Sequence, residues 1–138
     1  MLKLEIPRYI FEDMLDQARA EAPIECCGIL AGRNGRAEKL YKMANAEHRR
    51  DHFMMEPEQQ FEAVKDIRSS SLDMLAIYHS HPETPARPSA EDVRLALTPN
   101  VVYVILSLQP DNGPAVKGFQ IEDGTVTRVP VRIMEDQQ

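Results

Sequence analysis

Apolar side chains recur at helical spacing in three segments of the chain. Residues 7 to about 22 carry an apolar side chain every three to four positions, which predicts an amphipathic helix with Pro7 near its first turn. A second helix is predicted from residue 57, with Phe61, Val64 and Ile67 on a shared face. A third is predicted from Ser89 through about residue 97.

Short apolar runs bounded by turn signals predict a set of β-strands. Asn34-Gly35 is a tight-turn signal, and Asp123-Gly124 separates the last two runs as a closing hairpin. The three prolines between residues 82 and 88 predict a loop. The predicted strands are residues 24–32, 36 to about 43, 53–55, 72–78, 101–108, 116–121 and 126–133.

Helices and strands are mixed along the chain, which indicates an α/β or α+β fold around one sheet. The 138 residues, 43% of them hydrophobic, are enough for a single domain spanning 1–138 with a real core. Lys and Arg number 16 against 22 Asp and Glu, a net charge of -6. With no basic face, neither nucleic acid nor an anionic membrane is an expected partner.

The start of the chain and its cysteines indicate a compartment. An acidic residue and a proline interrupt the N-terminal segment early, so it does not resemble a signal peptide, and no apolar run approaches the length of a membrane span. Cys26 and Cys27 are adjacent, and a disulfide between neighbours is strained. We therefore expect two reduced core thiols in a cytoplasmic protein.

Two histidines and an aspartate predict a metal site. His79 and His81 directly follow the predicted strand at 72–78. Side chains two positions apart on an extended segment point to the same side. Asp92 lies in the first turn of the next predicted helix, which the proline-rich loop can fold back over the histidines. Two nitrogens and one carboxylate oxygen leave a fourth tetrahedral position on zinc for water, which is the catalytic pattern. Bound zinc lowers the pKa of such a water towards about 7.

Two further residues are candidates for proton transfer and oxyanion stabilisation. Glu25 is a carboxylate in an otherwise apolar predicted strand, and it can act as the base that activates the zinc-bound water. Taken alone, Glu25 also fits a salt-bridge partner or a strand end. Ser89 can donate a hydrogen bond to the developing oxyanion, although Ser89-Ala90-Glu91-Asp92 also fits a helix cap. Both roles are compatible in one serine.

Other polar and sulfur-containing residues carry less signal. His48 and His52 are predicted to be solvated loop residues, with substrate contact as the alternative. Met54, Met55 and Tyr78 are predicted to contribute packing rather than recognition.

The five candidate residues resemble a known motif. The order is Glu25, a long gap, His79-Ser80-His81, seven residues, Ser89, two residues and Asp92. This pattern is similar to the motif of the JAB1/MPN/Mov34 (JAMM) zinc metalloproteases. The segments around Glu25-Cys26-Cys27-Gly28 and Ala86-Arg87-Pro88-Ser89 resemble small prokaryotic members. The resemblance spans roughly residues 5 to 130.

This resemblance implies a cytidine-deaminase-like fold with a curved sheet between helices, one zinc ion per chain, and hydrolysis of a peptide or isopeptide bond. The chain is too compact for the two insertions with which eukaryotic members grip ubiquitin. Small prokaryotic relatives cut at the Gly-Gly C-terminus of ubiquitin-like sulfur-carrier proteins, so such a protein is the expected partner. We expect its extended tail to pair with an exposed edge around residues 48–55.

Two alternatives stay open from the sequence. One is a non-catalytic interaction module that retains zinc, as some relatives are scaffolds. The other is a small-molecule zinc hydrolase or deaminase, but zinc deaminases use cysteines spaced as Cys-x-x-Cys, which Cys26-Cys27 lacks.

Overall fold

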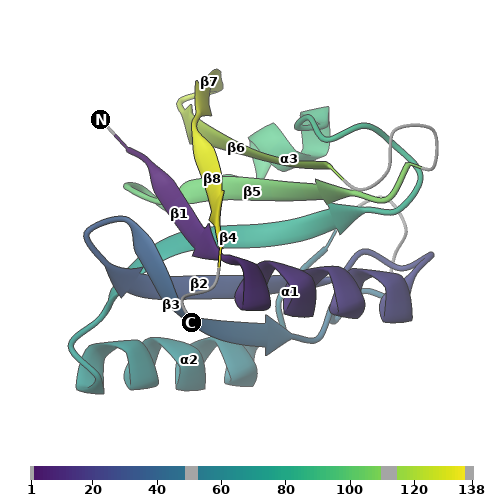
Figure 1. Cartoon of the computed structure of the whole chain (residues 1–138). Coiled ribbons are helices and arrows are strands. Elements are labelled where there is room, and N and C mark those ends of the chain that lie inside the picture. Colours follow the sequence, from purple (N-terminus) through teal and green to yellow (C-terminus); the bar gives the residue numbers. More distant parts are fainter. Residues whose placement is uncertain (1, 49–52, 110–114, 136–138) are drawn as a thin grey trace.

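The computed structural model describes residues 2–48, 53–109 and 115–135. In this part of the chain, one mixed sheet is flanked by helices (Figure 1). The helices are α1 (Arg8–Glu21), α2 (Pro57–Ser69) and α3 (Ala90–Arg94). The strands are β1 (Leu4–Pro7), β2 (Cys27–Arg33), β3 (Arg36–Met43), β4 (Asp73–His81), β5 (Val102–Ser107), β6 (Ala115–Glu122), β7 (Thr125–Val129) and β8 (Val131–Met134). The predicted fold class is confirmed.

The sheet has the strand order β7-β6-β5-β4-β2-β3-β1-β8. Strand β4 lies near its middle, antiparallel to β2 and parallel to β5. The predicted hairpin of β2 and β3 is confirmed, and its turn residues Asn34 and Gly35 have φ of 55° and 78°. Positive φ at both central positions is what a type I′ turn requires.

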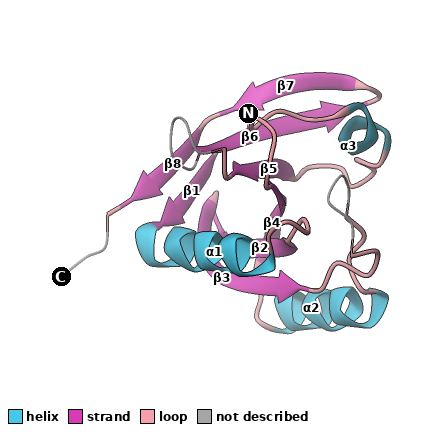
Figure 2. Ribbon diagram, turned by 90° about the vertical axis from the view of Figure 1, so that its right-hand side faces the viewer, coloured by secondary structure: helices cyan, strands magenta, loops and turns pink. Residues whose placement is uncertain are grey.

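The last predicted strand is in fact two strands at opposite edges of the sheet. Strand β7 pairs with β6, whereas β8 pairs in parallel with β1. The break is at Pro130, which has no N–H for a ladder but whose carbonyl accepts a hydrogen bond from the Leu4 N–H at 3.2 Å. A Cβ at Gly118 of β6 would lie 2.6 Å from Val131 of β8. The two edges therefore approach each other, and Figure 2 shows the sheet curving round α1.

Each face of the sheet packs against its own hydrophobic cluster. The first cluster joins α1 to side chains that include Ala76 and Tyr78 of β4. The second joins α2 and α3 to side chains that include Ile77. Because side chains alternate along a strand, His79 and His81 lie on the face of Ile77, under α2 and α3.

The helix predictions hold for α1 and need correction for α2 and α3. In α1 the residues Ile10, Met14, Leu15 and Ala18 are buried as predicted. In α2 the predicted face is confirmed at the buried Ile67 and wrong at Phe61, which is 62% exposed. Ala63, which was not predicted, is buried against the sheet. Helix α3 ends at Arg94, short of the predicted end, and beyond it the Ala96 N–H donates to the Val93 carbonyl rather than to that of Asp92.

Two further differences from the sequence predictions concern short strands. Strand β1 was not predicted, and the predicted strand at 53–55 is reduced to a single antiparallel bridge between Asn45 and Met55.

Among the described residues, none of the helices combines the length and apolarity needed to cross a membrane.

Candidate metal centre

Strand β4 carries two histidines on one face at its C-terminal end. Its pairing with β2 on one side and β5 on the other fixes the positions of both residues. The predicted orientation is confirmed, because the Nε2 atoms of His79 and His81 lie 3.2 Å apart. Both side chains are almost completely buried.

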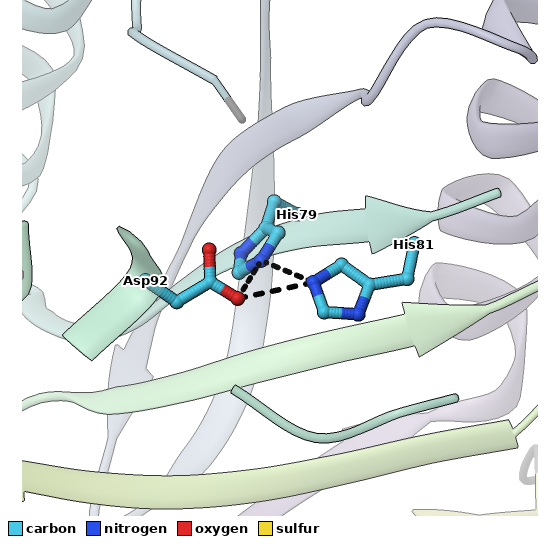
Figure 3. A group of neighbouring side chains, drawn as sticks. All are labelled: His79, His81 and Asp92. Atoms are coloured by element: carbon cyan, nitrogen blue, oxygen red, sulfur yellow. Dashed lines mark hydrogen bonds and ion pairs between the residues drawn. The ribbon is translucent and has the colours of Figure 1, made fainter. Parts of the chain in front are cut away.

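Helix α3 brings a carboxylate to the two imidazoles. The Ser89 hydroxyl accepts a hydrogen bond from the Asp92 N–H at 3.0 Å, and Asp92 Oδ2 accepts one from the Ser89 N–H at 2.9 Å. This capping box fixes Oδ2 at 3.2 Å from His79 Nε2 and 3.0 Å from His81 Nε2 (Figure 3). The three residues form a buried group that can hold a metal ion.

The protonation state of His81 shows why this group fits a cation. Its Nδ1 lies 2.9 Å from the Pro85 carbonyl, which can only accept, so Nδ1 carries the proton. In the neutral ring, Nε2 then presents a lone pair to a carboxylate oxygen. Two acceptors in contact need a cation or a proton between them. The three separations also match the edges of about 3.3 Å in a tetrahedron with zinc–ligand bonds of about 2.0–2.1 Å.

The pKa values of these groups reflect burial set against mutual attraction. Burial lowers the pKa of His79 below its ordinary value. Burial also disfavours the charged form of His81, but hydrogen bonds to Asp92 and Pro85 and the charges of Asp92 and Glu25 raise its pKa overall. Burial would raise the pKa of Asp92, yet its close contacts with both imidazoles hold that pKa far below the usual range. The lowered pKa values of Asp92 and His79 favour the carboxylate and the neutral imidazole, which are the forms that bind a metal.

An aromatic ring covers the His79 imidazole. Phe53 stacks on it with ring centroids 4.6 Å apart and an interplanar angle of 24°. Among the described residues, no hydrogen-bond partner reaches His79 Nδ1, which is buried. On the Nδ1 side, stacking on Phe53 rather than a hydrogen bond therefore holds this ring.

Glu25 lies just before β2 rather than within it, which corrects its predicted place in a strand. It is only 2% exposed. The N–H of its neighbour Cys26 donates a hydrogen bond to Ser80 Oγ at 2.8 Å, and the Cys26 carbonyl accepts one from the Ser80 N–H at 3.0 Å. These two bonds place the segment beside the end of β4. The charge of Glu25 contributes to raising the pKa of His81.

Ser89 is half-buried beside the same group. Its hydroxyl oxygen accepts the Asp92 N–H, so the predicted cap is confirmed. Within the described residues, no acceptor takes up its hydroxyl proton, which therefore stays available to a bound molecule. The catalytic role of Ser89, like that of Glu25, stays a prediction.

Sequence reasoning missed three groups that shape the site. These are the amide of Asn45, the ring of Phe53 and the carbonyl of Pro85. A loop asparagine and a carbonyl carry no signal of their own. Phe53 was part of a predicted strand, and its apolar neighbours indicated only packing.

The remaining polar and sulfur-containing candidates are not members of the metal-binding group. Cys26 and Cys27 are free and fully buried, and burial raises the pKa of both thiols to about 12. Their predicted place in the core is confirmed, and the cytoplasmic location stays a prediction. His48 is exposed, as predicted, whereas His52 lies outside the described residues.

Comparison with known proteins identifies the family. The model of prokaryotic homologs of the JAB domain matches residues 7–120. The chain belongs to this family. The CysO-cysteine peptidase of Mycobacterium tuberculosis is 35% identical over 124 residues, which cover 88% of this chain and 85% of the relative. The probable TtuB-protein conjugate cleaving protease of Thermus thermophilus is 32% identical over 124 residues, covering 89% and 79%.

A solved structure has the same fold as this JAB-family chain. The solution structure of a protein from Desulfitobacterium hafniense is 40% identical, with a TM-score of 0.87 and coverage of 96% of this chain and 94% of that one. The resemblance to the JAMM metalloproteases and the enzyme class, a JAMM-type metallopeptidase, are confirmed.

Proposed function

We propose that the protein is a zinc-dependent metalloprotease that hydrolyses the bond after the Gly-Gly C-terminal tail of a ubiquitin-like or sulfur-carrier protein. The observation that carries the proposal is the buried triangle of His79 Nε2, His81 Nε2 and Asp92 Oδ2, with sides of 3.0–3.2 Å. Support for a conjugate as substrate comes from two relatives, one named a CysO-cysteine peptidase and one a probable TtuB-protein conjugate cleaving protease.

The proposed ligands are His79, His81 and Asp92, with one zinc ion per chain. Three protein ligands leave a coordination position open, as catalytic zinc sites do. When bound, zinc supplies a Lewis acid and lowers the pKa of water to about 7. The Pro85 carbonyl contacts His81 Nδ1, and the Ser89 N–H donates to Asp92 Oδ2. These contacts fix the orientation of the two ligands.

Glu25 is the proposed general base. The carboxylate takes the proton of the attacking water and delivers it to the amine nitrogen as the scissile C–N bond breaks. Two observations support this role: the side chain is buried away from bulk solvent, and its charge acts on His81.

Ser89 is the proposed oxyanion donor. The N-cap bond to Asp92 fixes the hydroxyl oxygen at the edge of the metal group. Its remaining proton can point to the carbonyl oxygen of the scissile bond, where negative charge develops.

The preference for a glycine tail is explained by the path that a substrate takes to the metal-binding group. A tail that reaches a buried centre between the end of β4 and the start of α3 passes close to backbone, and glycine has no Cβ to clash. An extended tail can also pair with a strand edge. Our candidate edge is residues 48–55, of which 49–52 lie outside the described residues. In the described part of this segment, Met55 forms an antiparallel bridge with Asn45.

The proposed function is tested with a carrier protein of β-grasp fold whose Gly-Gly tail is extended by one amino acid. The zinc-loaded full chain is added, and the carrier mass is followed over time. We expect loss of the terminal residue, and no loss when Glu25→Gln replaces the wild type or when either glycine is replaced by a bulky residue. Zinc-loaded protein that leaves every such adduct intact would contradict the proposal and favour a scaffold or a small-molecule hydrolase.

A further inference from the structure

A small cavity lies directly against the metal-binding group. Its lining consists of Phe53, His79, Asp92, Leu95, Tyr103 and Ile121. Its volume is about 30 Å³. Because His79 and Asp92 form part of the wall, a side chain that enters this cavity belongs to a residue next to the reacting bond.

The walls of this cavity are apolar and firmly held. Tyr103 on β5 is buried, and its hydroxyl accepts the Thr98 N–H at 2.9 Å and donates to the Thr98 carbonyl at 3.3 Å. The ring is thereby fixed, and so is the segment that follows α3. Ile121 on β6 is buried, and Phe53 is stacked on His79. Leu95 is 45% exposed and forms the outer rim.

The proposed substrate leaves one candidate for this space. Both residues before the scissile bond are glycines, which have no side chain to place in a cavity. The residue after the bond is the first one that has a side chain within reach of the metal group. We propose that the cavity receives the side chain of this leaving residue and selects a small apolar one. This inference rests on the proposed function and defines its substrate class further.

Size and polarity set the expected selection. A water molecule needs about 10–15 Å³ of such volume, so a cavity of about 30 Å³ admits roughly two non-hydrogen atoms. The side chains of alanine and cysteine meet this limit, and a thiol behaves as a small apolar group. Phenylalanine and lysine side chains are too long. A carboxylate would lose its hydration against rings and aliphatic walls.

The test compares carriers that end in Gly-Gly-X, where X is alanine, cysteine, aspartate, lysine or phenylalanine. Zinc-loaded full chain is used, and kcat/KM for release of X is measured by mass spectrometry. We expect alanine and cysteine adducts to be cleaved at least about tenfold more efficiently than the other three. Equal kcat/KM for all five adducts would overturn the cavity assignment and leave the proposed function standing. Cleavage of none would contradict both.

A matched pair of leucine variants assigns the selection to this cavity. Leu95→Ala enlarges the rim, so we expect the preference for alanine over phenylalanine adducts to fall by about tenfold. Leu97 is 82% exposed on the same segment and lines a neighbouring hollow but not this cavity. Leu97→Ala is expected to keep the wild-type preference. The assignment is overturned if the two variants change the preference equally or if Leu95→Ala leaves it unchanged.

Discussion

The side-chain amide of Asn45 donates a hydrogen bond to the backbone carbonyl of Glu25 over 3.1 Å. Its Oδ1 accepts the N–H groups of Glu47 and Met54 at 3.0 and 3.2 Å. One buried side chain therefore joins the segment that carries Glu25 to the segment that carries Phe53. The second of these segments contacts the metal-binding group directly, because Phe53 stacks on His79.

We expect Asn45→Ala to act on the rate through the position of Glu25. The variant leaves buried backbone groups without partners, at a cost of about 1–3 kcal/mol in the free energy of unfolding. Zinc content is expected to stay at the wild-type level, because Asn45 is not one of the three proposed ligands, while kcat falls. Stability, zinc and kcat are measured on one preparation. Wild-type kcat in a folded Asn45→Ala protein would show that Asn45 has no positioning role.

Glu25→Gln separates the base from the ligands. The amide has the shape of the carboxylate but cannot accept the proton, so kcat is expected to fall by about 10²–10⁴-fold. Zinc content and thermal midpoint are expected to stay close to wild type. Glu62→Gln, on the exposed face of α2, is the control and is expected to keep full activity. Hydrolysis at the wild-type rate in Glu25→Gln would mean that the base is another residue.

Ser89 is expected to show two separable effects. Ser89→Ala removes the acceptor for the Asp92 N–H, which costs about 1 kcal/mol of stability as a lost N-cap. It also removes the proposed oxyanion donor, so kcat is expected to fall by about 10²-fold or more at temperatures where the variant is fully folded. Ser89→Thr keeps a hydroxyl and serves as the control, with most of the stability and rate retained. A folded Ser89→Ala protein with wild-type kcat would assign this serine to capping alone.

Gly28 tests how α1 is attached to the sheet behind the site. A Cβ at this position would overlap the Tyr78 ring, which is fully buried. The ring cannot shift easily, because its hydroxyl donates to Gln17 Oε1 at 2.6 Å and Gln17 donates in turn to the Cys27 carbonyl at 3.0 Å. We expect Gly28→Ala to lower the free energy of unfolding by about 1–3 kcal/mol in chemical denaturation. An unchanged denaturation midpoint would contradict this packing account.

The parts of the fold that the sequence predicted are those with a strong local pattern. The helical spacing of Ile10, Met14, Leu15 and Ala18 and the apolar run before His79 each specify an element without reference to the rest of the chain. The parallel pair β1 and β8 could not be found this way. Each strand has four residues, and the partners lie at opposite ends of the chain. The face of α2 was misassigned at one position, because the large apolar Phe61 is exposed while the smaller Ala63 is buried.

In the site, the residues on regular elements could be predicted from their spacing, whereas those on loops could not. The alternation of β4 and the cap at Ser89 were enough to expect His79, His81 and Asp92 together. The contacts of Asn45 and the Pro85 carbonyl depend on how two irregular segments fold over the sheet. Their partners are distant or on the backbone, so no residue pattern marks them.

The most direct test of the account is the zinc content of dialysed protein, measured by elemental analysis. The account predicts one zinc ion per chain in the wild type and in Glu25→Gln, and almost none in His81→Ala. His48→Ala, which removes an exposed histidine apart from the metal group, is expected to retain one. Full zinc content in His81→Ala, or a wild type that takes up no zinc when it is supplied, would contradict the central claim.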